Sequence, residues 1–136
     1  MRVLIVEDEF LIAQLLESVV KDHGYETIGP VATVEQALAY APRADVALVD
    51  LGLSDGDSGR LLARRLIDRF RIDVIFVTGD PGAVQQGFDG ALAVICKPFR
   101  EEEIVKALAM ALEKRNRSAL RPDPARLSSL DSAGTP

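Results

Sequence analysis

The stretch "VALVDLGLSDGDSG", residues 46–59, combines the pattern of a buried strand with a charged end. Its first four residues are apolar, and the run then stops on the carboxylate of Asp50. An ionised side chain costs free energy at a buried position unless a partner or a cation compensates it. Either Asp50 is a solvated strand end, which is the more common case, or its charge has a function. The rest of the chain decides between these two interpretations.

Four further apolar, β-branched runs resemble this one, and stretches typical of helices separate them. The five runs are residues 2–6, 27–31, 46–51, 74–78 and 93–96. Strands that are apolar throughout, rather than in alternation, are typical of a parallel sheet covered on both faces. The sequence therefore predicts an α/β domain of five βα units, and Cys96, in the last run, is expected to pack in its core.

Apolar side chains at helical spacing predict the better helices. These stripes run over residues 10–22, along Leu61, Leu62, Leu66 and Phe70, and along Ile104, Val105, Leu108 and Leu112. Two segments are poorer helix formers. Residues 34–41 are short and stop before Pro42, and residues 80–91 contain one proline and three glycines. Each interior glycine costs a helix about 1 kcal/mol relative to alanine, so we expect residues 80–91 to be short, frayed or mobile.

Composition and charge exclude several classes of protein. The chain has 136 residues and a net charge of -5, and residues 1–100 carry 15 acidic against 10 basic side chains. This acidic excess disfavours general nucleic-acid binding, which depends on neutralising phosphates. No apolar run approaches the roughly 20 residues of a membrane-spanning helix, and no signal peptide is evident, so we expect a cytoplasmic protein without membrane partners. A lone Cys96 excludes an internal disulfide.

One helix has a basic character, and the end of the chain has a different composition. Arginines at positions 60, 64, 65, 69 and 71 make the third helix basic; a solvated face is the default interpretation and a docking surface the alternative. Residues 118–136 are rich in Ser, Pro and Ala without a periodic apolar face. We therefore predict a folded domain over residues 1–117 and a disordered tail over residues 118–136.

The unusual polar residues follow the predicted strands. Glu7, Asp8 and Glu9 follow the first strand, Asp50 the third, Thr78 ends the fourth, and Lys97 and Pro98 follow the fifth. In an open parallel sheet, ligands bind at the carboxyl ends of the strands. Each residue alone has a structural explanation, such as a solvated loop, a helix cap or a strand end. Their conjunction in this order favours a functional site.

The chemistry of this set indicates a magnesium site that handles a phosphoryl group. Carboxylates packed together repel one another, and a divalent cation with oxygen ligands, Mg²⁺ or alternatively Mn²⁺, compensates them. Asp50 could then act as a nucleophile, because carboxylates form aspartyl phosphates. Lys97 would contact one phosphoryl oxygen as a compact cation, and the Thr78 hydroxyl would donate to another.

The motifs "VLIVEDE" (3–9), "ALVDLGLSDGDSG" (47–59), "VIFVTGD" (74–80) and "VICKPF" (94–99) together resemble the receiver domain of response regulators in two-component signalling. The resemblance covers residues 1–117. It implies a flavodoxin-like (βα)5 fold, with a five-stranded parallel sheet in the order 2-1-3-4-5 and five helices on its two faces. It also implies that Asp50 takes a phosphoryl group from a histidine kinase or a histidine phosphotransfer protein.

The same resemblance implies a role for each remaining site residue. Asp8, Asp50 and the backbone carbonyl of Gly52 would hold Mg²⁺, with Glu7 acting through water. Thr78 would be the switch hydroxyl and Lys97 the partner of the phosphoryl group. The peptide bond before Pro98 is expected to be cis, which is uncommon even before proline.

One departure from the family pattern concerns the switch. Most receivers carry Tyr or Phe three residues before the lysine, whereas this chain has Val94. With "FVTGD" (76–80), this resembles a divergent receiver subgroup that has a Phe-Ala-Thr-Gly-like motif. We hypothesise that phosphorylation of Asp50 tightens the Thr78 loop and orders residues 80–90.

Three functions compete. The first is a stand-alone phosphoaccepting regulator, not an enzyme, which signals by protein contact or drains phosphate from a shared kinase. The second is a magnesium-dependent phosphohydrolase of similar topology, although Gly52 stands where such enzymes carry an aspartate as general acid. The third is a pseudo-receiver scaffold, against which the complete set of acidic residues, Thr78 and Lys97 argues.

Overall fold

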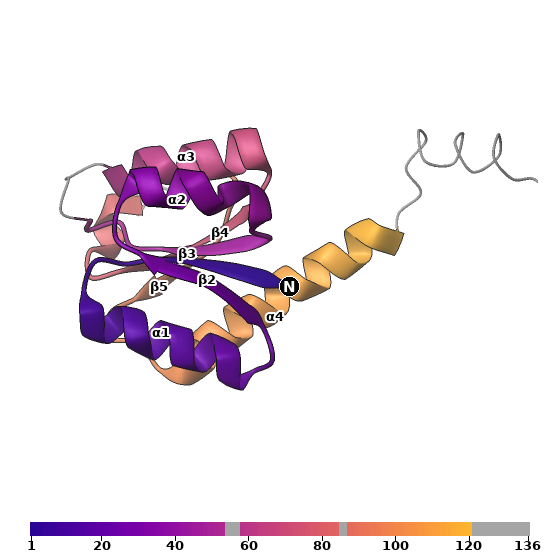
Figure 1. Cartoon of the computed structure of the whole chain (residues 1–136), viewed down its shortest axis with the longest axis horizontal. Coiled ribbons are helices and arrows are strands. Elements are labelled where there is room, and N and C mark those ends of the chain that lie inside the picture. Colours follow the sequence, from indigo (N-terminus) through magenta and orange to yellow (C-terminus); the bar gives the residue numbers. More distant parts are fainter. Residues whose placement is uncertain (54–57, 85–86, 121–136) are drawn as a thin grey trace, which may run out of the picture.

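A five-stranded parallel sheet forms the centre of the molecule (Figure 1). The computed structural model describes residues 1–53, 58–84 and 87–120. The strands lie in the order β2-β1-β3-β4-β5, and every neighbouring pair is parallel. They are β1 (Arg2–Val6), β2 (Glu26–Val31), β3 (Val46–Val49), β4 (Asp73–Thr78) and β5 (Ala91–Cys96). The predicted strands and the sheet order 2-1-3-4-5 are confirmed.

Helices cover both faces of this sheet, as predicted (Figure 1). They are α1 (Phe10–Asp22), α2 (Val34–Tyr40), α3 (Ser58–Phe70) and α4 (Glu101–Leu120). In Figure 1, α2 and α3 lie on one side of the strands, and α1 and α4 lie on the other. Two apolar clusters fill the two interfaces, one under α2 and α3 and one under α1 and α4. The sheet is therefore the middle layer of three.

The sequence of α2 explains why so short a segment is helical. Thr33 precedes the helix, and its hydroxyl accepts a hydrogen bond from the Gln36 backbone N–H at 3.2 Å. The Gln36 side chain in turn accepts from the backbone N–H of Ala32 at 3.0 Å. These bonds satisfy backbone donors that the first turn leaves without partners. The helix ends at Tyr40, and a 3-10 turn, η1 (Ala41–Arg43), accommodates Pro42.

The expectation of five helices is wrong for the described residues. Between β4 and β5 the chain forms only a 3-10 turn, η2 (Pro81–Val84). Gly87 and Gly90 follow with φ angles of 87° and 88°, which lie in the left-handed region and end any right-handed helix. The weak helical character of residues 80–91 thus has a clear physical cause. Residues 85–86 of this segment lie outside the described part of the chain.

Strand β5 is less covered than the other strands, and the expected burial of Cys96 is wrong. Cys96 is exposed, Val94 is 40% exposed, and within β5 only Ile95 is buried. Because η2 is short, no helix among the described residues covers the side of this edge strand from which Val94 and Cys96 project. The apolar composition of residues 93–96 therefore reflects sheet formation more than burial.

Some members of the predicted helical stripes also lie at the surface. Leu11, Leu15 and Leu61 are exposed, whereas their neighbours Leu16, Leu62 and Leu66 are buried. A helix that covers one face of a sheet buries only part of its circumference, and apolar residues at the borders of the stripe remain in contact with water.

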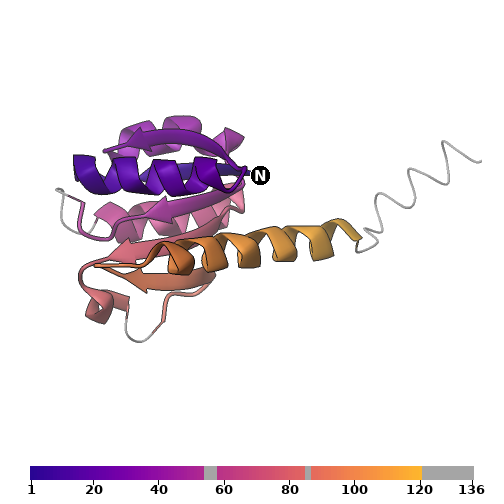
Figure 2. The same ribbon diagram turned by 90° about the horizontal axis from the view of Figure 1, so that it is seen from below.

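The last helix is longer than predicted. Helix α4 continues to Leu120, three residues past the predicted end of the domain at 117. In Figure 2 its C-terminal half extends beyond the layered part of the molecule. The rest of the expected tail, residues 121–136, lies outside the described residues.

Gly59 allows α3 to begin close to the strand end that carries Asp50. A Cβ atom at this position would lie 2.6 Å from the Asp50 backbone oxygen and 2.9 Å from Leu51 Cα. Both neighbours are backbone atoms, which cannot move aside as a flexible side chain can. A residue without a side chain is therefore required where the first turn of α3 crosses the β3 end.

We predict that Gly59→Ala destabilises the chain by about 1–3 kcal/mol, because the clash outweighs the better helix propensity of alanine. Urea unfolding followed by circular dichroism measures this difference. Gly79→Ala is the matched control, since a Cβ there has no atom within 4 Å. Its unfolding free energy should stay within about 0.5 kcal/mol of the unmodified chain. Equal stability of the two variants would contradict the proposed contact.

Candidate functional site

The candidate site lies at the edge of the sheet where the strands end in their carboxyl direction. Asp50 follows β3, Glu7 and Asp8 follow β1, and Thr78 is the last residue of β4. Lys97 follows β5. Strands β1, β3, β4 and β5 are consecutive in the sheet, so all four of these strand ends lie side by side. The sheet thus brings together residues that lie up to 90 positions apart in the sequence (97 minus 7).

The Lys97 amine lies among the carboxylates. Its Nζ atom is 2.8 Å from Glu7 Oε1, 3.3 Å from Asp50 Oδ2 and 3.7 Å from Glu9 Oε1. Glu7 and Asp50 are each only 3% exposed. Buried charges of the same sign repel strongly unless a counter-charge lies between them, and the amine provides it. The direct ion pair of Glu7 with Lys97 was not predicted from the sequence, which shows no sign of their contact.

Three carboxylates in this site are arranged so that they could hold a metal ion. Glu7, Asp8 and Asp50 each offer an oxygen, and these oxygens all lie within 4.8 Å of one another. Oxygen ligands of this kind suit a hard divalent cation such as Mg²⁺. Glu7 Oε1 is buried and, within the described part of the chain, has no hydrogen-bond partner of good geometry besides its ion pair. The donor set therefore fits a divalent cation.

The environment shifts the pKa values of two of these groups. Burial, together with a hydrogen bond to Asp50, raises the pKa of Glu7 from 4.5 to about 7. Burial alone would lower the pKa of Lys97, but the hydrogen bond to Glu7 and the nearby carboxylates outweigh it, and the pKa is raised. The amine is thus held in its charged form, whereas the protonated form of Glu7 is favoured more than that of an ordinary glutamate.

Thr78 is buried and its hydroxyl makes a local contact. Its Oγ1 accepts a hydrogen bond from the Asp80 backbone N–H at 2.9 Å, and its carbonyl accepts from the Lys97 backbone N–H at 2.8 Å. The first bond ties the Thr78 side chain to the start of the segment before η2. The second bond holds the Lys97 backbone beside the end of β4.

The loop after β3 also bends back on Asp50. The Gly52 backbone N–H donates to Asp50 Oδ1 at 2.8 Å, so this turn fixes one carboxylate oxygen. The Lys97–Pro98 peptide bond is cis, the isomer that the family resemblance implies. Residues 54–57, between this turn and α3, lie outside the described residues.

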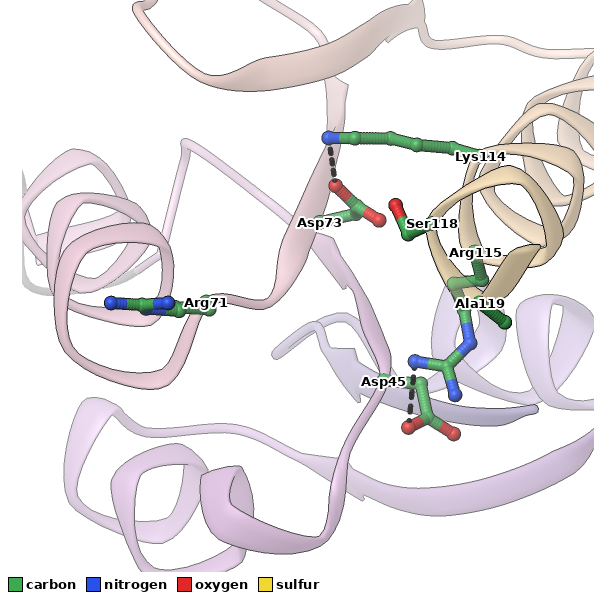
Figure 3. A pocket seen from close by; sticks show the side chains of 7 residues that line it. All are labelled: Asp45, Arg71, Asp73, Lys114, Arg115, Ser118 and Ala119. Carbon is green, nitrogen blue, oxygen red and sulfur yellow. Dashed lines mark hydrogen bonds and ion pairs between the residues drawn. The ribbon is translucent and has the colours of Figure 1, made fainter. Parts of the chain in front are cut away.

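A separate polar pocket of about 410 Å³ lies at the opposite edge of the sheet (Figure 3). Asp45 precedes β3 and Asp73 begins β4, and both face the far half of α4. Lys114 pairs with Asp73 at 2.6 Å, and Arg115 pairs with Asp45 at 3.0 Å. These ion pairs tie α4 to the strand starts, which gives this pocket a structural role distinct from the carboxylate site.

Comparison with known proteins identifies the family. Residues 3–109 match the response regulator receiver domain, and the chain belongs to this family. The regulator PhyR of Methylorubrum extorquens is 35% identical over 114 residues, which cover 81% of this chain and 43% of PhyR. The transcriptional regulatory protein PdtaR of Mycobacterium tuberculosis is 31% identical over 134 residues, which cover 93% of this chain and 64% of PdtaR. The chain thus matches less than two thirds of either relative.

Solved structures agree with this assignment. The response regulator PhyR from Brucella abortus superposes with a TM-score of 0.77 at 30% identity, covering 88% of this chain and 50% of that one. The signal receiver domain of a modulated diguanylate cyclase from Desulfovibrio desulfuricans superposes with a TM-score of 0.76 at 30% identity, covering 86% and 97%. Among the described residues, no helix is long and apolar enough to cross a membrane.

The raised pKa of Glu7 predicts a particular pH dependence of stability. Between 4.5 and about 7 the folded chain binds more protons at Glu7 than the unfolded chain does. The free energy of unfolding therefore falls as pH rises through this range, by roughly 2–3 kcal/mol from this group. Glu7→Gln stays neutral at every pH and should lose this fall. Urea titrations of both chains in EDTA measure the difference.

The control for this titration is Glu26→Gln, which removes an exposed carboxylate on β2. The free energy of unfolding of this variant should change with pH as that of the unmodified chain does. If the free energies of unfolding of Glu7→Gln and of the unmodified chain changed in parallel between pH 4.5 and about 7, the assigned environment of Glu7 would be wrong.

Proposed function

We propose that the chain is a phosphoaccepting signalling protein whose acceptor is Asp50. The supporting observation is the placement of a buried Asp50 carboxylate 3.3 Å from the Lys97 amine, beside Glu7 and Asp8. Receiver domains take phosphoryl groups from histidine kinases, and this chain belongs to that family. The donor is thus a histidine kinase or a histidine phosphotransfer protein.

In the proposed reaction, an Asp50 oxygen attacks the phosphorus of a phosphohistidine. The new P–O bond forms as the P–N bond breaks, and the histidine nitrogen leaves with the electron pair. The Lys97 amine would pair with the negative charge on the phosphoryl oxygens, because it already lies within contact distance of Asp50. The Gly52 backbone N–H holds the other Asp50 oxygen in place.

Asp8, Asp50 and the Gly52 backbone carbonyl would hold Mg²⁺ or Mn²⁺, with Glu7 acting through a bound water. The three carboxylates support this assignment by their mutual distances of at most 4.8 Å. When bound, the cation offsets the charge on the transferred group. Asp8 and Glu7 would then position the cation and supply negative charge around it.

A phosphohydrolase is less well supported, because Gly52 offers no side chain as a general acid two residues after Asp50. A pure scaffold is also less well supported, because it does not require a partly buried lysine between buried carboxylates. We propose that output is by protein contact or by draining phosphate from a shared kinase.

The test is incubation with acetyl phosphate and Mg²⁺, followed by intact mass measurement. The unmodified chain should gain the mass of one phosphoryl group, and EDTA should prevent this. Asp50→Asn should gain none, because an amide does not form the acyl phosphate. The exposed Asp89→Asn is the matched control and should be modified like the unmodified chain. An adduct that persists in Asp50→Asn would refute the assignment.

The proposed switch acts through Thr78 and the segment that follows it. The Thr78 hydroxyl now accepts a hydrogen bond from the Asp80 backbone. A phosphoryl group on Asp50 offers it an oxygen to donate to, so Thr78 would turn toward Asp50 and pull on residue 80. Phe88 packs edge-to-face on Phe76 of β4 at 5.0 Å, and this contact connects the far end of the segment to the same strand. We propose that residues 80–90 become more ordered in response.

Amide hydrogen exchange with and without beryllofluoride and Mg²⁺ tests this switch. Backbone amides in residues 80–84 and 87–90 should exchange about tenfold more slowly with the mimic, the factor that corresponds to roughly 1.4 kcal/mol of local stabilisation. Asp50→Asn treated in the same way is the control and should not change. Equal protection of the segment in both states would contradict the proposed switch while leaving phosphorylation itself intact.

A further inference from the structure

A groove on the surface of α3 is separate from the carboxylate site. Arg60, Leu61 and Arg64 of α3 and Phe88 from the segment before β5 line a depression of about 310 Å³, which we call the α3–Phe88 groove. Its lining is mostly apolar, with two guanidinium groups at its sides. The groove forms where Phe88 and Asp89 contact Arg64 of α3, and the described residues between β4 and β5 form only the short turn η2.

The walls of this groove are held in place by several contacts. The Arg64 guanidinium stacks over the Phe88 ring at 4.6 Å and donates to the Asp89 carbonyl at 2.8 Å. It also pairs with Asp68 at 3.2 Å. Phe88 in turn rests on the buried Phe76. These contacts place the Phe88 ring against α3 before any partner binds.

An apolar contact point stands at the centre of the groove. Leu61 is 67% exposed, although its helical neighbours Leu62 and Leu66 are fully buried. Together with the Phe88 ring, Leu61 gives the groove an apolar centre between guanidinium groups, and protein interfaces likewise combine an apolar core with a polar rim. The Phe88 ring extends this apolar area beyond α3.

The charges around the groove indicate the chemistry of the partner. Helix α3 carries four arginines and one aspartate, although the whole chain has a net charge of -5. Elsewhere in the described residues, six basic side chains pair with carboxylates of the chain: Arg2, Lys21, Lys97, Lys114, Arg115 and Arg117. On α3, the one such pair among the described residues is that of Arg64 with Asp68. Arg60, Arg65 and Arg69 are exposed and have no carboxylate partner within residues 1–53, 58–84 and 87–120, so an acidic partner could pair with them.

We propose that the α3–Phe88 groove binds an acidic segment of a partner protein that inserts one apolar side chain against Leu61 and Phe88. A carboxylate beside that side chain would pair with Arg60, while Arg64 keeps its contacts with Asp68, Phe88 and Asp89 and forms a wall of the groove. This surface goes beyond the phosphoacceptor function and does not depend on it, because all of its contacts exist without a phosphoryl group. The α3–Phe88 groove would therefore give this receiver domain a second interaction surface.

A fluorescein-labelled 15-residue helical peptide with leucines along one face and glutamates on both flanks is the probe. Fluorescence anisotropy with the unphosphorylated full chain should show saturable binding that weakens as salt is added. Arg60→Glu should weaken binding at least about tenfold, because it turns an attraction into a repulsion. Leu61→Ser should weaken it to a similar extent through loss of the apolar contact. Both side chains are exposed, so both variants should fold.

Three controls make the outcome decisive. Arg43→Glu, which reverses an exposed charge outside α3, should bind like the unmodified chain. A peptide with lysines in place of the glutamates should not bind. No saturable binding up to about 1 mM peptide, or equal binding by Arg60→Glu or Leu61→Ser, would overturn the proposal. So would self-association of the chain that Leu61→Ser abolishes, because the groove would then bind a second copy.

Discussion

The ion pair between Lys97 and Glu7 is the interaction on which the site depends. At 2.8 Å it places a positive charge between carboxylates that are almost completely buried. Without this amine, Glu7 and Asp50 would face each other in a region of low dielectric, where at least one of them would be neutral. Lys97 follows β5, so the pairing of β5 with β4 is what carries the amine to the acidic residues after β1 and β3. The order of the strands and the charge balance of the site are thus coupled.

The charge balance also explains why a cation and a phosphoryl group suit the same site. Glu7, Asp8 and Asp50 supply up to three negative charges, and Lys97 supplies one positive charge. A divalent cation held by these carboxylates would bring the cluster close to neutrality, so that an incoming phosphoryl group would no longer be repelled. The raised pKa of Glu7 reflects first its burial and then its contact with Asp50.

The segment that follows Thr78, which would transmit phosphorylation of Asp50 to other proteins, is built differently from the site. The site is anchored by buried strand ends, whereas the described residues between Asp80 and Gly90 are held by the Thr78 hydroxyl, the buried Val84 side chain, the Phe88 ring and the Arg64 guanidinium. Segments with few buried contacts are the ones that open and close at low free-energy cost. Phe88 provides an aromatic contact to β4 in a chain whose position 94 is valine, and it also forms a wall of the α3–Phe88 groove.

The sequence by itself determined the five strands, their order through the family pattern, and the residues that meet at the carboxyl edge of the sheet. Periodicity and strand ends are local properties, so Asp50, Asp8, Thr78 and Lys97 could be located without coordinates. Only the tertiary structure decided which charges touch, that Cys96 and Leu61 are exposed, and that a 3-10 turn replaces a helix before β5. Burial depends on what covers a side chain, and the covering residues come from distant parts of the chain. The ion pair of Glu7 with Lys97 joins residues 90 positions apart (97 minus 7), and no local pattern encodes such a contact.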